Sequence, residues 1–247
     1  MKKILFSLVF FITSLLSNEL QEAIDNASEG SIITLSKGEY HGNIVINKAL
    51  VIDGIDKKAK IIGDGKGSVI SIKKSNVVIK NLSIENSGFS VEKIDSAIHA
   101  KEVNNITIEN NHISDSLFGI NFEQVNRSKI VDNFITSKDL ELGIRGDGIR
   151  LWNSHDNQLF ANRLYKSRDF VLWYSSGNNI ENNYGSYNRY SLHFMYAGRN
   201  MVRNNFFEYN SVGIFFMYSS GTIAIGNTVK NSLGAFGVGI GMKDSSD

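Results

Sequence analysis

The chain has 247 residues and a formal net charge of +1, and it contains neither cysteine nor proline. Without cysteine, a disulfide framework, a thiolate metal centre and a cysteine nucleophile are excluded. The near-zero net charge does not predict a nucleic-acid partner. Hydrophobic residues make up 42% of the chain and aromatic residues 11%, so the composition predicts a globular protein with a sizeable core.

The first residues predict an export signal. Lys2 and Lys3 precede an apolar run over residues 4–16, which is short for a membrane-spanning helix and is followed by Ser17 and Asn18. This layout is typical of a secretory signal peptide, with a retained membrane anchor as the alternative. We therefore expect residues 1–17 to be a signal peptide and residues 18–247 to be an exported domain, which in a bacterium would lie in the periplasm.

The next segments predict one helix followed by many short strands. Residues 20–27 place Leu20, Ala23, Ile24 and Ala27 at helical spacing, which indicates a short amphipathic helix. From Ile32 onward the apolar residues alternate in short runs separated by Gly and Asn. These runs are typical of short β-strands, and they cover residues 44–46, 50–52, 69–72 and 77–84.

An asparagine repeats along the chain with a period of about 22 residues. The longest interval, 29, is one period with an insertion at residues 137–145. A second marker lies ten residues before four of these asparagines and keeps the same phase. Two markers in one phase indicate a solenoid. The asparagines are Asn111, Asn133, Asn162, Asn183, Asn205 and Asn227, and the second marker is Trp152, Trp173, Met195 and Met217.

Short strands with Asn and Gly corners predict an all-β fold, a single-stranded right-handed parallel β-helix with coils of about 22 residues. The Leu-x-x-Leu-x-Leu pattern of a leucine-rich repeat is absent. Each coil should form three strands stacked about 4.8 Å from the next coil. Proline has almost no place in such a stack, because internal strands need their N–H groups for the ladder. We expect the asparagine column to form a ladder of side-chain amides at one corner.

Alignment of the coils on the second marker separates inward from outward positions. Two apolar columns alternate with it and should line the core: Ile149, Phe170, Leu192 and Ile214, and Leu151, Leu172, Phe194 and Phe216. The outward columns are Arg150, Val171, His193 and Phe215, then Trp152, Trp173, Met195 and Met217, followed at the turn by Asn153, Tyr174, Tyr196 and Tyr218.

We call Trp152, Trp173, Met195 and Met217 the aromatic–methionine stripe. A contiguous apolar stripe on the outside of a soluble protein usually marks a contact surface, although a loop or a further part of the chain could also cover it. The predicted partner-binding residues are Arg150, Trp152, Trp173, Tyr174, Tyr196, Phe215 and Tyr218.

The same face predicts a soft metal site. Met195 and Met217 share one column on adjacent coils, and His193 lies two residues before Met195. Thioether and imidazole ligands suit Cu(I), so copper is a possible cofactor, although methionine is also a common contact residue. We expect Met242 to extend the column, with a register left open by an insertion at residues 233–237. The candidate ligands are His193, Met195, Met217 and Met242.

The carboxylates do not predict an enzyme. A β-helix glycosidase or lyase needs two or three acids that converge on one groove. Asp147 and Asp169 fall near one corner of successive coils, but Asp169 follows Arg168 and is expected to pair with it. Glu123 lies in the second-marker column without an acid partner. There is also no phosphate loop and no serine triad. A polysaccharide-acting lyase or hydrolase remains the alternative function.

Several central motifs resemble the NosD family. They are Gly148-Ile-Arg-Leu-Trp152, Ser167-Arg-Asp-Phe-Val-Leu-Trp-Tyr-Ser-Ser-Gly177, Arg189-Tyr-Ser-Leu-His-Phe-Met-Tyr196, Phe215-Phe-Met-Tyr-Ser-Ser220 and Gly239-Ile-Gly-Met-Lys-Asp-Ser-Ser246. The resemblance covers essentially all of the chain after the signal peptide. One departure is Ser191, where the family more often has glycine.

The resemblance implies a non-enzymatic accessory protein. NosD proteins are periplasmic right-handed β-helices that work with an ABC transporter to assemble the copper–sulfur centre of nitrous oxide reductase. The implied partners are the ABC transporter membrane subunit, nitrous oxide reductase and a copper chaperone lipoprotein. The family's chains are longer and this one ends at Asp247 without a cap, so we expect a chain truncated at its C-terminus.

Overall fold

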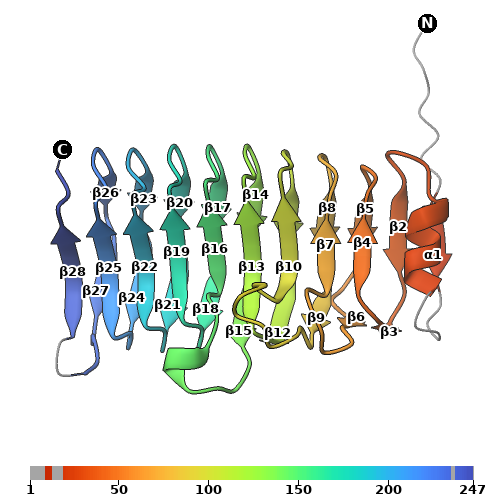
Figure 1. Ribbon diagram of the computed structural model, residues 1–247, viewed down its shortest axis with the longest axis horizontal. Coiled ribbons are helices and arrows are strands. Elements are labelled where there is room, and N and C mark those ends of the chain that lie inside the picture. Colours follow the sequence, from red (N-terminus) through yellow and green to blue (C-terminus); the bar gives the residue numbers. More distant parts are fainter. Residues whose placement is uncertain (1–8, 13–18, 235–236, 247) are drawn as a thin grey trace, which may run out of the picture.

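The computed structural model describes residues 9–12, 19–234 and 237–246, and it is a right-handed parallel β-helix. Figure 1 shows the coils side by side along the long axis, with a single α-helix at the N-terminal end. Three parallel sheets run the length of the described residues, which confirms the predicted fold class and the three strands in each coil. The predicted signal peptide lies largely outside the described residues and stays a prediction; within it, β1 (Val9–Ile12) pairs with β2 (Ile32–Leu35).

We name the three sheets A, B and C. Sheet A contains β1, β2, β5 (Val51–Asp53), β8 (Val78–Lys80), β11 (Thr107–Glu109), β14 (Lys129–Val131), β17 (Gln158–Phe160), β20 (Asn179–Glu181), β23 (Met201–Arg203) and β26 (Ile223–Ile225). Sheet B contains β3 (Gly38–His41), β6 (Ala59–Ile62), β9 (Ser83–Glu85), β12 (His112–Ser116), β15 (Phe134–Ser137), β18 (Arg163–Tyr165), β21 (Tyr184–Ser186), β24 (Phe206–Glu208) and β27 (Thr228–Lys230). Sheet C contains β4 (Ile44–Ile46), β7 (Ile70–Ile72), β10 (Ser96–Lys101), β13 (Phe118–Glu123), β16 (Ile149–Trp152), β19 (Asp169–Trp173), β22 (Tyr190–Met195), β25 (Val212–Met217) and β28 (Val238–Lys243).

The predicted helix is present as α1 (Glu19–Asn26), with Leu20 and Ile24 buried against the first coil. Its Gln21 side chain exchanges two hydrogen bonds with the backbone of Val45 in β4, at 2.8 and 3.2 Å. Because β4 is the edge strand of sheet C, this contact satisfies backbone groups that would otherwise be free to pair with another chain.

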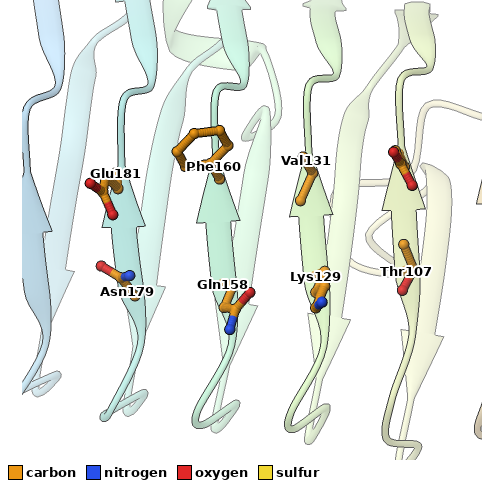
Figure 2. A pocket seen from close by; sticks show the side chains of 8 residues that line it. Thr107, Lys129, Val131, Gln158, Phe160, Asn179 and Glu181 are labelled. Carbon is orange, nitrogen blue, oxygen red and sulfur yellow. The ribbon is translucent and has the colours of Figure 1, made fainter.

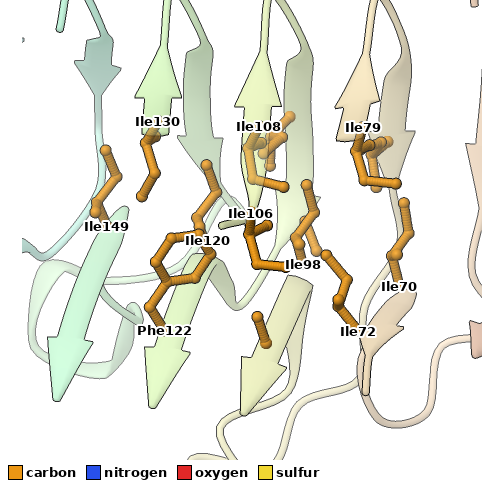
Figure 3. Close-up of a cluster of buried hydrophobic side chains, with 14 of the residues drawn as sticks. Ile70, Ile72, Ile79, Ile98, Ile106, Ile108, Ile120, Phe122, Ile130 and Ile149 are labelled. Carbon is orange, nitrogen blue, oxygen red and sulfur yellow. The ribbon is translucent and has the colours of Figure 1, made fainter. Parts of the chain in front are cut away.

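The core consists of apolar columns inside the coils (Figure 3), where isoleucines from sheets A and C meet around Phe122. Both inward columns predicted from the alignment are buried, with exposed fractions between 0% and 7%. The insertion at residues 137–145 leaves this register intact, because it forms a loop with one 3-10 turn, η1 (Leu142–Ile144), between β15 and β16. The last coil is more open, and Ile240 and Met242 are 59% and 64% exposed.

The predicted asparagine ladder is confirmed. Each Nδ2 from Asn111 to Asn205 donates to the Oδ1 of the asparagine one coil later, at 2.9 to 3.0 Å. The backbone N–H of the same residue donates to that same Oδ1. A second ladder, not predicted from the sequence, joins Asn157, Asn178 and Asn200 at another corner. Buried corner groups therefore find partners in the neighbouring coil, as buried polar groups must.

Candidate functional site

The aromatic–methionine stripe lies on the outward face of sheet C in the predicted register. Trp152, Trp173, Met195 and Met217 are in-register partners on β16, β19, β22 and β25. All four side chains are half-buried. At the turn that follows, Tyr174, Tyr196 and Tyr218 are 47%, 48% and 36% exposed. The most accessible part of this surface is therefore the row of tyrosines.

The three tyrosine rings form a stack along the corner. Their centroids are 5.2 and 4.8 Å apart, with interplanar angles of 12° and 9°. The Trp173 ring is also stacked on Tyr174, at 6.3 Å. All three tyrosines have φ near +50°, a left-handed conformation that L-residues adopt at a cost of roughly 1–2 kcal/mol each. The rings support one another, so the stack presents a rigid aromatic rim beside the stripe.

The second outward column is less exposed than the alignment predicts. Val171 and His193 are only 4% and 6% exposed, and Arg150 and Phe215 are half-buried. The Arg150 guanidinium donates a hydrogen bond to Asn121 Oδ1 at 2.9 Å, and burial lowers the pKa of Arg150. Val171 and His193 are therefore covered by neighbouring side chains, whereas Arg150, Phe215, the stripe and the tyrosine rim are partly accessible to a partner.

Met242 does not extend the stripe. The strand register pairs Phe216 with Met242 and Met217 with Lys243, so Met242 occupies an inward column and Lys243 takes the stripe position. The insertion at residues 233–237 lengthens this coil to 26 residues, and a one-residue difference in register moves a side chain to the opposite face of a strand. The expectation that Met242 joins the metal-ligand column is wrong for this reason.

A hollow of about 220 Å³ lies beside the stripe at the start of β19 and β22. Its floor carries two buried carboxylates, Asp147 and Asp169, which are 3% and 2% exposed. The lining residues are Asp147, Arg168, Asp169, Val171, Trp173, Arg189, His193 and Met195. The sequence analysis considers most of these residues separately, but it does not predict that they line one hollow together with Arg189.

The two carboxylates are paired differently from the sequence prediction. Asp169 does not pair with Arg168; instead Arg168 Nε donates to Asp147 Oδ1 at 3.0 Å. Asp169 accepts two hydrogen bonds from Arg189, one at 2.9 Å from Nε and a shorter one from Nη2. Each arginine thus reaches back to the aspartate of the previous coil. An Asp followed about 21 residues later by an Arg is the sequence signal that could have revealed these pairs.

The two carboxyl groups have opposite pKa shifts. Burial, together with the nearby charge of Asp169, raises the pKa of Asp147 to about 6 despite Arg168. Burial also raises the pKa of Asp169, but the nearby His193 ring and the hydrogen bonds from Arg189 outweigh it and hold that pKa below its ordinary value. Asp169 is therefore the fixed negative charge of the hollow, and Asp147 is the group that takes up a proton as the pH falls towards 6.

The raised pKa of Asp147 predicts a pH-dependent stability. The pKa of Asp147 is higher in the folded chain than in the unfolded chain, so the folded chain binds this proton more tightly. The stability that results from this difference is fully present below about pH 4. This contribution, about 3 kcal/mol for a pKa raised from 3.8 to about 6, is lost as the pH rises through about 6. Urea unfolding at pH 4.5 and 7.5 should show the loss in the wild-type chain and a smaller one in Asp147→Asn. Equal pH dependence in both chains would refute the assignment.

Two side chains that line the hollow have buried nitrogen atoms without hydrogen-bond partners among the described residues. They are Trp173 at Nε1 and His193 at both ring nitrogens. The His193 ring stacks on Tyr190 with centroids 4.4 Å apart, and its Nδ1 lies 3.7 Å from Asp169 Oδ2. Buried polar atoms are nearly always satisfied, so unsatisfied ones beside a hollow are consistent with a ligand-binding role.

In the parts of the chain that the structure describes, no cluster of three or more His, Cys, Asp or Glu side chains could hold a metal ion. A site for a hard cation made from such ligands is therefore not found there. The soft set proposed from the sequence is different, because it relies on methionine sulfur. His193 and Met195 line one hollow, and Met217 follows Met195 in register on the next coil.

No helix among the described residues is long and apolar enough to cross a membrane.

Comparisons with known proteins agree with the fold and with part of the resemblance. The NosD family, described as a periplasmic copper-binding protein, matches residues 135–247. A cell surface glycoprotein of Methanothermus fervidus is 32% identical over 106 residues, which are 42% of this chain and 17% of that protein's length.

Two solved structures share the fold at low identity. An alginate lyase from a Paenibacillus species has a TM-score of 0.70 at 13% identity, covering 97% of this chain and 99% of that one. A family 28 exopolygalacturonase from Yersinia enterocolitica has a TM-score of 0.72 at 12% identity, covering 95% and 58%. Identities this low establish the β-helix alone. The hollow and the stripe both lie within residues 135–247, the segment that matches the NosD family.

Proposed function

We propose that this chain is a periplasmic, non-enzymatic accessory protein that works with an ABC transporter in assembling the copper–sulfur centre of nitrous oxide reductase. The observation that carries the proposal is the in-register stripe of two tryptophans and two methionines with a stacked tyrosine rim, inside the segment matched by the NosD family. The proposed partners are the transporter's membrane subunit, nitrous oxide reductase and a copper chaperone lipoprotein.

The chemistry of the stripe suits docking. Aromatic residues and methionine are enriched at protein interfaces, where they bury large areas with little loss of side-chain entropy. The tyrosine stack is already ordered, so binding would not need to immobilise it. The row from Tyr174 to Tyr218 follows three successive coils and would form one edge of the contact.

Replacing Trp173 and Met195 together with serine should abolish co-purification with nitrous oxide reductase or the transporter, because it removes the middle of the stripe. The matched control is Phe160→Ser with Met201→Ser, which changes one aromatic residue and one methionine on sheet A. Both double variants should keep the wild-type far-UV spectrum. If the stripe variant co-purifies as well as the wild type, the docking proposal fails.

Copper handling is a second part of the proposal. His193 has two buried nitrogens without hydrogen-bond partners among the described residues, and it shares the hollow with the thioether of Met195. A nitrogen and sulfur donor set of this kind favours Cu(I). Residues His193, Met195 and Met217 would hold the ion, while Asp169 would orient the imidazole through its Nδ1. Met242 is excluded from this set by its register.

An anaerobic Cu(I) titration against a bathocuproine-type competitor tests this part. The wild-type chain should compete for the ion, and the triple change of His193, Met195 and Met217 to alanine should lower its affinity at least 100-fold. Met242→Ala should bind as the wild type does, since that side chain lies in another column. Equal affinity of the triple variant and the wild type would rule out the site.

A polysaccharide-acting lyase or hydrolase is the other candidate, and the two buried carboxylates of the hollow favour it. The pKa of Asp147 is raised and that of Asp169 is lowered, so one carboxyl group can carry a proton while its neighbour stays ionised. Acid–base catalysis by two carboxyl groups uses this arrangement. Both carboxylates are nevertheless bonded to arginines and almost fully buried, which leaves little room for a substrate oxygen. Incubation with polygalacturonate or alginate should release no unsaturated or reducing ends; release that Asp147→Asn abolishes would favour the enzyme.

A further inference from the structure

A second hollow lies on sheet A, on a different face from the stripe. It has a volume of about 400 Å³ and spans β11, β14, β17 and β20 (Figure 2). One row holds Thr107, Lys129, Gln158 and Asn179, and the other holds Glu109, Val131, Phe160 and Glu181. Phe160 is 42% exposed in the second row, between Val131 and Glu181.

The polar side chains of this hollow have no partners. No hydrogen bond, ion pair or ring contact joins any of the eight lining side chains to another side chain among the described residues. The Oδ1 atom of Asn179 is buried and unsatisfied as well. On sheet B, by contrast, the carboxylate of Glu208 has partners. It accepts a hydrogen bond from Tyr184 at 2.9 Å and forms an ion pair with Lys230 at 3.5 Å.

The two glutamates stay unpaired although each has a cation in the neighbouring coil. Lys80 is the in-register neighbour of Glu109, but its ammonium bridges Asp53 at 3.1 Å instead. Arg203 is the neighbour of Glu181, but its guanidinium lies 3.7 Å from the sulfur of Met201. The hollow thus keeps two carboxylates, two amides, one ammonium and one hydroxyl free around an exposed ring.

These groups point to a sugar chain as the ligand. The apolar face of a sugar ring packs on an aromatic side chain. The hydroxyls of the sugar donate hydrogen bonds to carboxylates, and they both donate to and accept from side-chain amides. An extended peptide is a poorer match, since the backbone groups of β14 and β17 are already paired on both sides. Two carboxylates against one ammonium also disfavour an acidic sugar.

We propose that this hollow binds a linear chain of neutral hexose sugars, with one ring on Phe160 and the chain running along the axis of the β-helix. The lining residues come from four successive coils about 4.8 Å apart, a spacing close to the length of one hexose unit in a linear chain. Gln158 and Asn179 hydrogen-bond the ring hydroxyls, and Glu109 and Glu181 accept hydrogen bonds from hydroxyls at the two ends.

Calorimetric titration of the purified chain with cellohexaose, mannohexaose and hexagalacturonate tests the proposal. At least one neutral hexasaccharide should bind, at least 10-fold more tightly than hexagalacturonate. Phe160→Ala should weaken that binding at least 10-fold, whereas Phe160→Tyr and the matched control Phe89→Ala should leave it unchanged, because Phe89 is an exposed ring outside the hollow.

Exchange of both glutamates for glutamine should reduce the discrimination against hexagalacturonate, because it removes the negative charge of the hollow. The proposal is overturned if neither neutral hexasaccharide binds, if Phe160→Ala binds as the wild type does, or if hexagalacturonate is preferred. These results are independent of the docking proposal, whose stripe lies on sheet C.

Discussion

Replacing Asn162 with alanine is expected to lower the free energy of unfolding by about 4 kcal/mol. Asn162 lies in the middle of the ladder, where its Oδ1 accepts from the backbone N–H and the Nδ2 of Asn133. Its own Nδ2 donates to the Ile130 carbonyl and to Asn183 Oδ1. Truncation leaves several of these buried groups unsatisfied, each at a cost of about 1–3 kcal/mol that is only partly additive.

Urea unfolding followed by far-UV circular dichroism measures this loss. The matched control is Asn182→Ala, at the turn position just before Asn183 in the next coil, because Asn182 is exposed and its side chain makes no hydrogen bond among the described residues. That control should cost no more than about 1 kcal/mol, since it only places alanine at φ 56°. If both variants lose the same stability, the ladder does not hold the coils together.

The second large effect is expected at Asp169. Asp169→Ala should destabilise the fold by about 3 kcal/mol, because it removes a buried carboxylate and leaves the Arg189 guanidinium, which is 41% exposed, without its acceptor. The backbone N–H of Tyr190 loses one of its two acceptors at the same time and keeps the Arg168 carbonyl. Asp169→Asn should cost less, since an amide oxygen can still accept from Arg189.

The comparison variant is Glu85→Ala, which breaks the more exposed pair with Lys60 on sheet B. It should cost less than about 1 kcal/mol, as is usual for an ion pair that remains hydrated. Chemical denaturation at pH 7 measures all three variants. A loss at Asp169 no larger than the loss at Glu85 would mean that the buried pair is not a structural element of the hollow.

Much of the fold could be predicted because a solenoid repeats its constraints in the sequence. The asparagines at a period of 22 and the columns from Ile149 to Phe216 fixed the register, and the structure reproduces both. The helix at residues 20–27 was found within one residue. Local periodicity carries this information because each coil contacts only its neighbours.

The parts that were missed depend on side-chain contacts between coils. The sequence pairs Arg168 with its neighbour Asp169, but each of the two side chains instead forms an ion pair with a residue of an adjacent coil. Met242 lies one position away from the stripe column, because the repeat does not predict the length of the insertion that precedes it. The Tyr187 and Tyr209 rings also stack, at 5.5 Å, on the corner before sheet C, and nothing in the period distinguishes them from ordinary turn residues.

Hydroxyl-radical footprinting in the presence of purified nitrous oxide reductase would show whether the stripe is a docking surface, because tryptophan, methionine and tyrosine are the side chains that hydroxyl radicals oxidise most readily. We expect the reductase to slow oxidation of Trp173, Met195 and Tyr196, which lie together on the stripe and its rim. Oxidation of Met201 and Tyr209, on other faces, should not change. If oxidation of Trp173, Met195 and Tyr196 is the same with and without bound reductase, the stripe is not where the reductase docks.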